Sequence, residues 1–386
     1  MEVRSMDKEY VLGTYGRFDV LIVKGKGSLM YDENGKEYID MGSGIAVNTF
    51  GVADDEWIGA VTAQLSSLQH CSNLYYSSPC VSLAQLLCER TGMSKVFFCN
   101  SGAEANECAI KAARKHGEVN KGKDHYAVIT LKNSFHGRTI TTLSATGQDV
   151  FHESFFPMTE GFIHVEANNI SELEKAVSEN KVAAVMIECV QGEGGVNALQ
   201  PDYVKAVRRI CDENDLLMIV DEVQTGNGRT GKLYSYMNFG VVPDVFTTAK
   251  GLGGGLPIGA CIMNEKTSKL FTPGSNGSTF GGNPAVCAGA YNIISRIDDE
   301  LLSEVDKKSK YVIDRLSSCS GVESVTGMGL MLGIKTKKDA GEVIKKCIEN
   351  GVLVIKAKNK VRLLPPLNIP MELLERAMDV IIDALK

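Results

Sequence analysis

Long hydrophobic runs are missing from this 386-residue sequence. Its apolar segments, such as 182–187 and 216–220, are far shorter than the roughly 20 residues that a membrane-spanning helix needs. The first eight residues contain no apolar core of a secretion signal. We therefore expect no membrane partner and a cytoplasmic protein.

Paired cysteines and metal-binding histidines are missing as well. None of the eleven cysteines forms a Cys-x-x-Cys pair, which argues against zinc ribbons and thioredoxin-like redox motifs. The six histidines show no spacing typical of a metal site, so we expect no metal. Cys99, Cys211 and Cys261 stand among apolar residues and are predicted to be buried free thiols in a reducing compartment.

Positive charge is not in excess: 41 lysines and arginines face 47 aspartates and glutamates, and the formal net charge is −6. The chain therefore has no general electrostatic attraction for nucleic acid, and we expect no nucleic-acid partner. An apolar content of 44% and a charged content of 23% are typical of a globular enzyme. A chain of this length is too long to fold around one small hydrophobic core, which predicts two domains, or a large domain with a smaller lobe.

Short apolar segments alternate with helical patterns in the middle of the chain. Strands are predicted at 96–99, 126–131, 182–188, 216–221, 245–249 and 260–263. Such strands separated by helices predict a parallel sheet covered on both faces, whose ligands bind beyond the carboxyl ends of the strands. Residues 21–40 predict a hairpin-like meander, and the long helices and short strands after Pro284 predict a C-terminal α+β lobe.

Lys250 ends one predicted strand and stands directly before a glycine-rich loop, 251–259. Burial lowers the pKa of a lysine and makes its amine a nucleophile towards carbonyls. Glycines beside it let a flat cofactor approach the backbone closely. The pattern is typical of a lysine that forms a Schiff base with pyridoxal phosphate (PLP). From this stretch alone, a surface lysine in a flexible loop remains the alternative.

Two further motifs follow predicted strands. Ser101-Gly102-Ala103 stands at a strand-to-helix turn whose free N–H groups favour an anion, and the helix is predicted to run through about His116. A capping box formed by Ser101 and Glu104 is the alternative, and both can hold together. Asp221 closes the apolar strand 216–220 and is well placed to keep a pyridine nitrogen protonated, although a turn cap is the simpler interpretation.

Three segments contain charged or aromatic residues that suggest contacts with a cofactor or a substrate. In Phe135-His136-Gly137-Arg138 the aromatic ring is able to stack on a flat cofactor and the arginine to bind a carboxylate; a surface loop is the alternative. Glu193 in a glycine-rich loop suggests a movable partner for an arginine. Arg362 lies inside an apolar run, where a cation is usually paired or functional.

Two glycine motifs point elsewhere. Gly226-x-Gly228-x-x-Gly231 matches the fingerprint of a dinucleotide-dependent dehydrogenase, but no clear helix follows it and no acid stands about 20 residues further on. Residues 117–123 match the start of a P-loop, yet Asp124 replaces the required Ser or Thr and the motif precedes a strand. We discard the P-loop and retain the dehydrogenase as a distant alternative.

Taken together, the motifs resemble those of the class III PLP-dependent aminotransferases, and within that family the branch that acts on acetylornithine. The resemblance runs from about residue 14 to the C-terminus. Its specific segments are 100–107, 134–139, 221–226, 249–250 and 277–284. Cys189, Asn276 and the segment 52–54 depart from the usual pattern, without touching the residues that would contact PLP.

The resemblance implies an α/β protein of PLP fold type I. A large domain over 46–284 would contain a mostly parallel sheet covered by helices. Residues 1–45 and 285–386 would form a smaller α+β domain. The resemblance also implies a homodimer with active sites at the subunit interface.

By the same resemblance, Lys250 is the Schiff-base lysine and Asp221 pairs with the pyridinium nitrogen. The other cofactor-binding residues are Gly102, Ala103, Phe135, Glu222, Val223, Gln224 and Thr279. Among them Phe135 stacks on the ring, Gln224 lies near the phenolic oxygen, and Thr279 reaches in from the neighbouring subunit. The substrate-binding residues are Arg138, Ser278, Glu193 and Arg362.

The implied reaction moves the terminal amino group of N2-acetylornithine to 2-oxoglutarate, giving N-acetylglutamate 5-semialdehyde and glutamate, a step of arginine biosynthesis. The partners are thus small amino acids and keto acids. Arg138 would anchor the distal carboxylate, while Glu193 would neutralise Arg362 in one half-reaction and free it for glutamate in the other. Ornithine, succinylornithine, succinyldiaminopimelate and 4-aminobutyrate remain alternative donors; Tyr15 and Phe280 favour acetylornithine.

Overall fold

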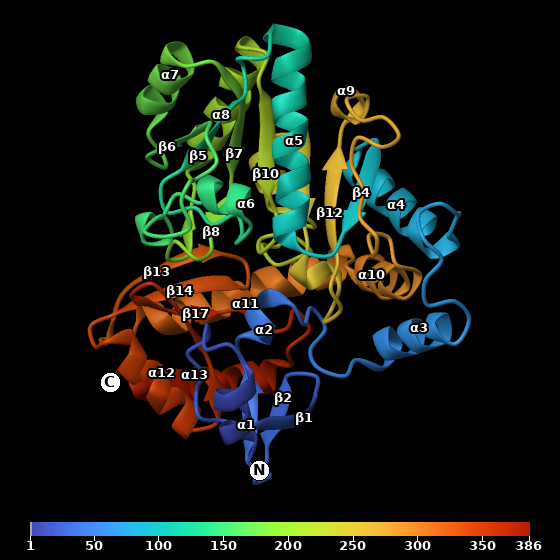
Figure 1. The fold of residues 1–386 in the computed structure, drawn as a ribbon. Coiled ribbons are helices and arrows are strands. Elements are labelled where there is room, and N and C mark those ends of the chain that lie inside the picture. The colour runs from blue at the N-terminus through green and yellow to red at the C-terminus, as the bar shows by residue number, and fades with distance from the viewer. Residues whose placement is uncertain (1) are drawn as a thin grey trace.

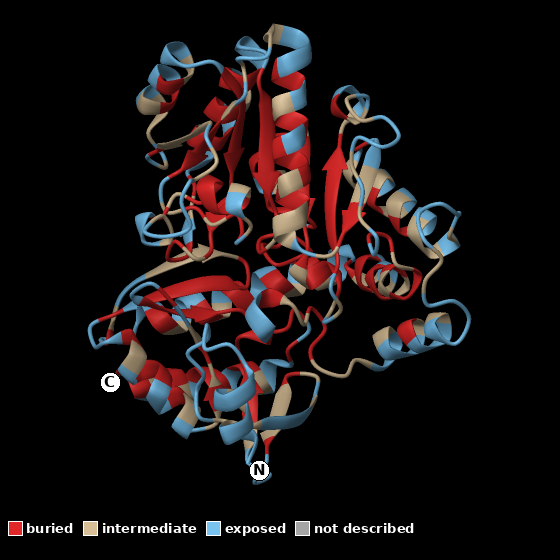
Figure 2. Cartoon of the chain, in the orientation of Figure 1, coloured by how far each residue is buried: buried red, intermediate tan, exposed pale blue. Residues whose placement is uncertain are grey.

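The computed structural model describes residues 2–386 and contains a seven-stranded central sheet (Figure 1). The strand order is β4-β12-β11-β10-β7-β5-β6. The strands are β4 (Lys95–Cys99), β5 (Ala127–Leu131), β6 (Phe162–Val165), β7 (Val182–Ile187), β10 (Leu217–Asp221), β11 (Val245–Thr248) and β12 (Gly259–Met263). The central strands are buried while the outer faces of the surrounding helices are exposed (Figure 2), which is why these strands are continuously apolar.

Helices and short turns connect these strands. The helices are α3 (Asp55–Leu65), α4 (Ser78–Thr91), α5 (Gly102–Lys121), α6 (Ile140–Ala145), α7 (Ile170–Glu179), α8 (Pro201–Glu213), α9 (Glu265–Ser268) and α10 (Pro284–Arg296). Three 3-10 turns, η1 (Asp149–Phe151), η2 (Ser235–Phe239) and η3 (Lys250–Leu252), and a small ribbon of β8 (Val190–Gln191) and β9 (Asn197–Ala198) complete this body. No helix in residues 2–386 is both long and apolar enough to cross a membrane.

The sheet is mostly parallel, as predicted, and one strand departs from this direction. β12 runs antiparallel to both of its neighbours, β11 and β4, whereas the pairs among β10, β11, β7, β5 and β6 are parallel. A parallel neighbour requires a crossover of about a dozen residues or more, usually with a helix. The segment between β11 and β12 contains only the turn η3, so the chain returns in the opposite direction.

The helix α5 continues to Lys121, past the predicted end at His116. Gly117 does not end the helix. A methyl group added at Gly117 would lie 1.8 Å from the carbonyl oxygen of His125. The glycine is therefore needed within the helix because the backbone at His125 packs directly against it. Cys99, Cys211 and Cys261 are buried free thiols, as the sequence predicts.

Both ends of the chain fold into a second body below the central sheet (Figure 1). The predicted meander is confirmed as β1 (Ile22–Lys26), β2 (Leu29–Asp32) and β3 (Glu37–Asp40), preceded by α1 (Val3–Tyr10) and followed by the turn α2 (Ser43–Ala46). The C-terminal part contributes α11 (Asp299–Ser317), β13 (Val322–Met328), β14 (Met331–Thr336), α12 (Ala340–Glu349), β15 (Val352–Leu353), β16 (Ile355–Ala357), β17 (Lys360–Leu363) and α13 (Met371–Leu385). β3 pairs in parallel with β15, with Ile39 opposite Val352, and both residues belong to one buried cluster.

Candidate active site

A cavity of about 460 Å³ opens at the carboxyl ends of the parallel strands. Its walls come from the loops that follow β4, β5, β7, β10 and β11, together with Val47 and the segment 255–258. This is the edge of the sheet that faces the second body in Figure 1. The sequence predicts a ligand at this edge, and Lys250, Asp221, Gly102, Phe135 and Arg138 all line the cavity, as do other predicted site residues: Ala103, Glu193, Val223 and Gln224.

Lys250 lies two residues after β11 and begins the turn η3. Its backbone φ is +45°, in the left-handed region, which costs a non-glycine residue about 1–3 kcal/mol and is most often found at functional sites. Burial lowers the pKa of the amine, an effect opposed by the charge of Glu193. Within residues 2–386 the amine has no hydrogen-bond or ion-pair partner. It is therefore a partly buried amine without a partner, facing the cavity.

Asp221 is held by three donors at the end of β10. Its Oδ2 accepts hydrogen bonds from His136 Nδ1 and Asn106 Nδ2, both at 2.8 Å, and its Oδ1 accepts one from the backbone N–H of Val223 at 3.0 Å. Burial lowers the pKa of His136, but Asp221 offsets this and the net pKa is raised. The second nitrogen of the ring, Nε2, is buried and has no partner in the described chain.

His136 and Asn106 were not predicted as site residues. His136 stands within the quoted motif 134–139 and Asn106 lies one helical turn after Gly102, on the inner face of α5. Asn106 also donates to the His136 carbonyl at 2.7 Å and accepts from Thr247. The motifs contain both residues, but the sequence alone does not show that both side chains hydrogen-bond to Asp221.

The turn before α5 combines both interpretations of its sequence. Ser101 Oγ caps the helix by accepting from the Glu104 N–H at 3.2 Å, and Glu104 accepts from the N–H of Asn100 at 2.5 Å. The N–H groups of Gly102 and Ala103 are in the first turn, where no intrahelical acceptor exists. A methyl group on Gly102 would lie 2.7 Å from Val223, so only glycine fits there. The turn can hold an anion against free N–H groups.

Phe135 and Arg138 lie on the loop after β5. The guanidinium of Arg138 is 5.5 Å from the centre of the Phe135 ring and 4.1 Å from that of Phe151. Arg138 is exposed and makes no ion pair with any residue from 2 to 386. A cation supported by aromatic rings and left without an acid is suited to bind a carboxylate.

Glu193 and Arg362 form an ion pair, with 2.6 Å between Glu193 Oε1 and an Arg362 nitrogen. The same guanidinium donates to Gln224 Oε1 at 3.0 Å and to the Lys356 carbonyl at 3.3 Å. Burial opposes ionisation of Glu193, but Arg362 offsets it, so the pKa of Glu193 lies below its ordinary value. Glu193 and Gln224 line the cavity whereas Arg362 does not.

Glu188 is a further cavity residue that was not predicted. Its carboxyl accepts from the N–H of Phe135 at 2.9 Å and of Gly192 at 3.4 Å. Burial raises its pKa to about 8, and the nearby Asp221 charge acts in the same direction, while His136 opposes them. Its position directly after an apolar strand is the signal that was available.

Besides Arg362, three predicted residues lie outside this cavity. The Glu222 carboxyl accepts from Ser235 Oγ at 2.6 Å and from Thr225 Oγ1 at 2.5 Å, so it faces away from the cavity. Ser278 and Thr279 line a separate depression. The prediction that Thr279 completes the site of a neighbouring subunit stays a prediction.

The alternative glycine motif does not open a helix. After Gly226, Gly228 and Gly231 the chain forms only the turn η2. Methyl groups on Gly228 and Gly231 would meet Leu367 at 2.8 Å and Asp306 at 2.1 Å, so these glycines allow contact with the C-terminal segment. No group of three or more His, Cys, Asp or Glu in the described part of the chain is arranged to hold a metal ion.

The fold matches known aminotransferase structures. The ornithine aminotransferase of Toxoplasma gondii, in a structure that shows partial occupancy of PLP at its active site, has a TM-score of 0.94 and 32% identity over 99% of this chain and 93% of that one. The architecture is fold type I of the PLP-dependent aminotransferases. The predicted fold class is confirmed.

Sequence comparison gives the family. The family model for class-III aminotransferases matches residues 12–385, so the chain belongs to that family. The chain is 44% identical over 386 residues to the acetylornithine aminotransferase of Haemophilus ducreyi, with 100% of this chain and 98% of the relative covered. It is 46% identical over 388 residues to the acetylornithine aminotransferase of Caldanaerobacter subterraneus subsp. tengcongensis, with 99% and 98% covered. The protein is an aminotransferase, as predicted.

Proposed function

We propose that the enzyme moves the terminal amino group of N2-acetylornithine to 2-oxoglutarate, a reaction that fits arginine biosynthesis. One observation carries this proposal: a partly buried, unpartnered Lys250 amine shares a cavity with the hydrogen-bonded carboxylate of Asp221 and with Glu193, the ion-pair partner of Arg362. The full-length similarity to two acetylornithine aminotransferases supports the choice of donor.

The cavity fits PLP on structural grounds. Lys250 would bind the aldehyde carbon, Asp221 would pair with the ring nitrogen, and the free N–H groups of Gly102 and Ala103 would hold the phosphate. A methyl group on Gly102 would collide with Val223, so the glycine lets this turn pack directly against the segment that follows Asp221. Bound PLP supplies a ring that withdraws electrons from the substrate carbon beside the amine.

Residues of the chain would transfer protons and stabilise charge during the reaction. The Lys250 amine, whose pKa is lowered by burial, would take a proton from the substrate carbon that bears the amine and deliver it to the cofactor carbon that receives the amino group. Asp221, supported by His136 and Asn106, would hold a proton at the ring nitrogen. Phe135 would cover the ring.

The two substrates need different carboxylate partners. In acetylornithine the reacting amine is far from the carboxylate, which Arg138 would bind at the cavity mouth. In glutamate the carboxylate stands beside the reacting amine, so Arg362 would bind it once Glu193 moves aside. The ion pair between Glu193 and Arg362 supplies the closed arrangement that this switch requires.

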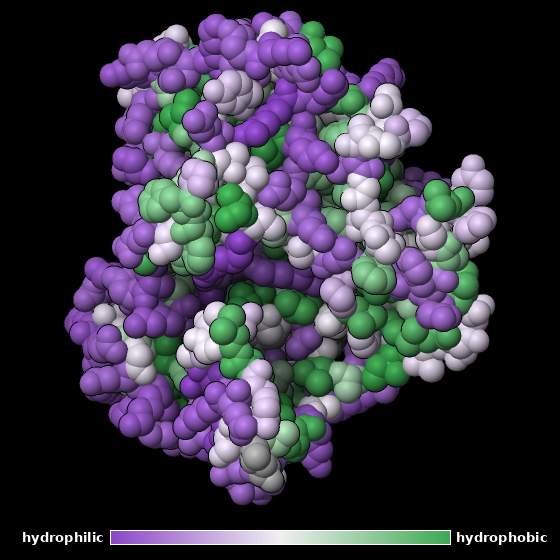
Figure 3. Space-filling model, in the orientation of Figure 1, coloured by the Kyte–Doolittle hydropathy of each residue, from purple (hydrophilic) through white to green (hydrophobic). Residues whose placement is uncertain are grey.

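A second copy of the chain would complete the site. Large apolar side chains are exposed at Leu74, Tyr75, Tyr76 and Phe280, and Figure 3 shows hydrophobic residues gathered over α3 on the same side of the molecule. Soluble monomers rarely expose such patches, which supports a homodimer in which Thr279 reaches the partner's cavity. The separate buried clusters support two domains, and the cluster of the large one also includes Cys287, Ala290 and Ile293 of α10, which the range 46–284 leaves out.

Absorbance of PLP-loaded protein tests the proposal. Acetylornithine, succinylornithine, ornithine and 4-aminobutyrate are added singly, at matched concentrations and without a keto acid. We expect fast loss of the bound-cofactor band with acetylornithine and slow loss with the others. A faster response to another donor would overturn the proposed substrate and keep the chemistry.

A further inference from the structure

Arg362 is screened from the cavity by two side chains, Glu193 and Gln224. Both line the cavity, whereas Arg362 is buried behind them with a side-chain exposure of 3%. One of its nitrogens, NH1, donates to both side chains, at 2.6 Å to Glu193 and at 3.0 Å to Gln224. The Gln224 amide nitrogen in turn donates to Glu193 at 3.3 Å. The three side chains form one closed triangle of hydrogen bonds.

The two screening residues differ in their freedom to move. The Glu193 side chain is 30% exposed and has space towards the cavity. Gln224 is only 7% exposed, and a methyl group added at Gly192 would lie 2.5 Å from its Oε1 atom. Gln224 is therefore packed against the backbone of the loop that carries Glu193. Movement of Glu193 by side-chain rotation leaves Gln224 where it is.

The loop itself is also fixed. Gln191 donates to the Lys132 carbonyl at 2.8 Å, and a methyl group on Gly194 would lie 2.3 Å from the Asn133 carbonyl oxygen. The backbone around Glu193 is thus packed against the loop that carries Phe135. A swing of the whole loop would break these contacts, so a switch at Glu193 must rotate the side chain on a fixed backbone.

When Glu193 rotates away, Arg362 keeps two acceptors, Gln224 Oε1 and the Lys356 carbonyl. A buried guanidinium that loses its acceptors shifts or becomes strongly unfavourable. We propose that Gln224 is a positioning residue that holds Arg362 in place for the incoming carboxylate of glutamate or 2-oxoglutarate, while Glu193 is the part that moves. This inference rests on the two-substrate switch of the proposed function.

The two hydrogen bonds of Gln224 have opposite consequences. Its carbonyl supports the open arrangement, because it keeps the guanidinium oriented without neutralising its charge. Its amide nitrogen supports the closed arrangement, because it holds Glu193 against Arg362. Loss of the side chain therefore weakens binding of the α-carboxylate beyond any loss, common to both donors, that follows from the position of Gln224 beside the cofactor.

The test uses Gln224→Met, which keeps the side-chain length and removes both hydrogen bonds. Single half-reactions are followed by absorbance on the PLP-loaded enzyme at saturating PLP, with glutamate and with acetylornithine. A hydrogen bond to a charged group is worth enough for about a tenfold change or more. We expect the dissociation constant for glutamate to rise about tenfold more than that for acetylornithine, with a smaller change in the maximal rate.

Gln191→Met is the matched control. Gln191 is also buried and hydrogen-bonded beside the same loop, but it does not line the cavity. General loosening of the loop should affect both half-reactions to a similar extent in this variant. Equal losses with both donors in Gln224→Met would show that Gln224 serves only the cofactor, and this would overturn the proposal.

A double variant, Glu193→Ala with Gln224→Met, separates the two hydrogen bonds. If Gln224 supports Arg362 directly, the loss of glutamate binding persists when Glu193 is absent. If the loss disappears, Gln224 acts only through Glu193 and the proposal fails. The glutamate measurements do not depend on the other donor, so a donor other than acetylornithine would overturn the proposed substrate and leave this test intact.

Discussion

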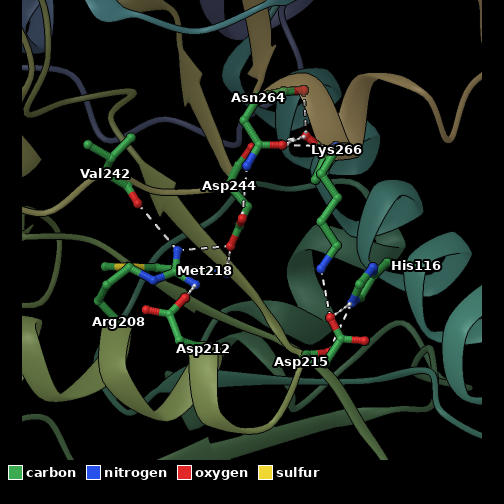
Figure 4. A network of polar contacts seen from close by, with 10 residues as sticks. His116, Arg208, Asp212, Asp215, Met218, Val242, Asp244, Asn264 and Lys266 are labelled. Atoms are coloured by element: carbon green, nitrogen blue, oxygen red, sulfur yellow. Dashed lines mark hydrogen bonds and ion pairs between the residues drawn. The ribbon is translucent and has the colours of Figure 1, made fainter.

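The two edges of the central sheet use similar residues in opposite ways. At the amino edge, Asp244 precedes β11 and accepts from Arg208 at 2.9 Å, from the Met218 N–H at 2.8 Å and from Asn264 at 2.9 Å (Figure 4). At the carboxyl edge, Asp221 ends the neighbouring strand and also has three donors. Both carboxylates are buried or nearly so and both are well supported.

The difference lies in the cations beside them. At the amino edge, Arg208 pairs with Asp244 and Asp212, and Lys266 pairs with Asp215 at 2.7 Å. At the carboxyl edge, Lys250 has no partner among residues 2–386. Charges that satisfy one another hold the fold together, whereas a buried amine left unsatisfied is available for chemistry.

The largest effect is expected from removing the unpaired amine. Lys250→Ala should reduce turnover to near the uncatalysed background, because no other described residue places an amine in the cavity. The PLP-free variant should unfold at the same denaturant concentration as the native chain, or at a higher one, since a buried group without a partner has been removed.

Lys266→Ala is the matched control at the other edge. Lys266 is half exposed and paired with Asp215. Its loss should leave turnover unchanged and should change the free energy of unfolding by no more than about 0.5 kcal/mol. Full turnover in Lys250→Ala would contradict the assignment of the cofactor lysine.

The next largest effect is expected at the amino edge of the sheet, where the charged side chains form ion pairs. Asp244→Ala removes an acceptor from Arg208 and from a backbone N–H, both mostly buried. We expect the free energy of unfolding to fall by roughly 2–3 kcal/mol, with turnover per folded molecule unchanged. Urea unfolding followed by fluorescence of Trp57, the single tryptophan, measures the change. A loss of turnover without a loss of stability would reverse the contrast between the edges.

A smaller effect is expected where the carboxyl edge does contain an ion pair. Glu193→Ala frees Arg362 permanently. Glutamate should then bind as well as before or better, while the half-reaction with acetylornithine slows by about tenfold, because the unpaired guanidinium attracts its carboxylate to the wrong place. The two half-reactions are measured separately by absorbance. Equal effects on both would rule out the switch.

The last expected effect is a gradual one, a pH dependence of stability. Burial raises the pKa of Glu188 to about 8, so between its ordinary value and about 8 the folded chain binds more protons at this site than the unfolded chain. Its stabilising contribution is thus complete at low pH and is lost as the pH rises. Relative to Glu188→Gln, the PLP-free native chain should lose on the order of 1 kcal/mol per pH unit between pH 6 and 8. A flat difference would show that Glu188 ionises normally.

The sequence predicted that polar residues following apolar strands would line a common cavity. Lys250, Asp221 and the turn at Gly102 could be identified in this way, because polar residues at strand ends meet at one edge of a sheet. Glu222 shows the limit of this reasoning. It follows Asp221 directly, yet its side chain faces the opposite way and binds Ser235.

The contacts between distant residues that complete the site could not be predicted from short sequence motifs. Asn106 meets Asp221 across 115 positions, and Arg362 meets Glu193 across 169. The direction of β12 and the continuation of α5 through Gly117 likewise depend on packing between distant segments. Periodicity locates helices and strands, but it does not specify which side chains face each other after folding.

The most direct measurement is to find where PLP is attached. The PLP-loaded protein would be treated with borohydride, which fixes the linkage between the cofactor and an amine, and digested for peptide mass mapping. We expect the added mass only on the peptide that contains Lys250, and none in Lys250→Ala. Attachment at another lysine, or equal labelling of the variant, would contradict the assignment of the unpaired amine at the carboxyl edge as the reactive group.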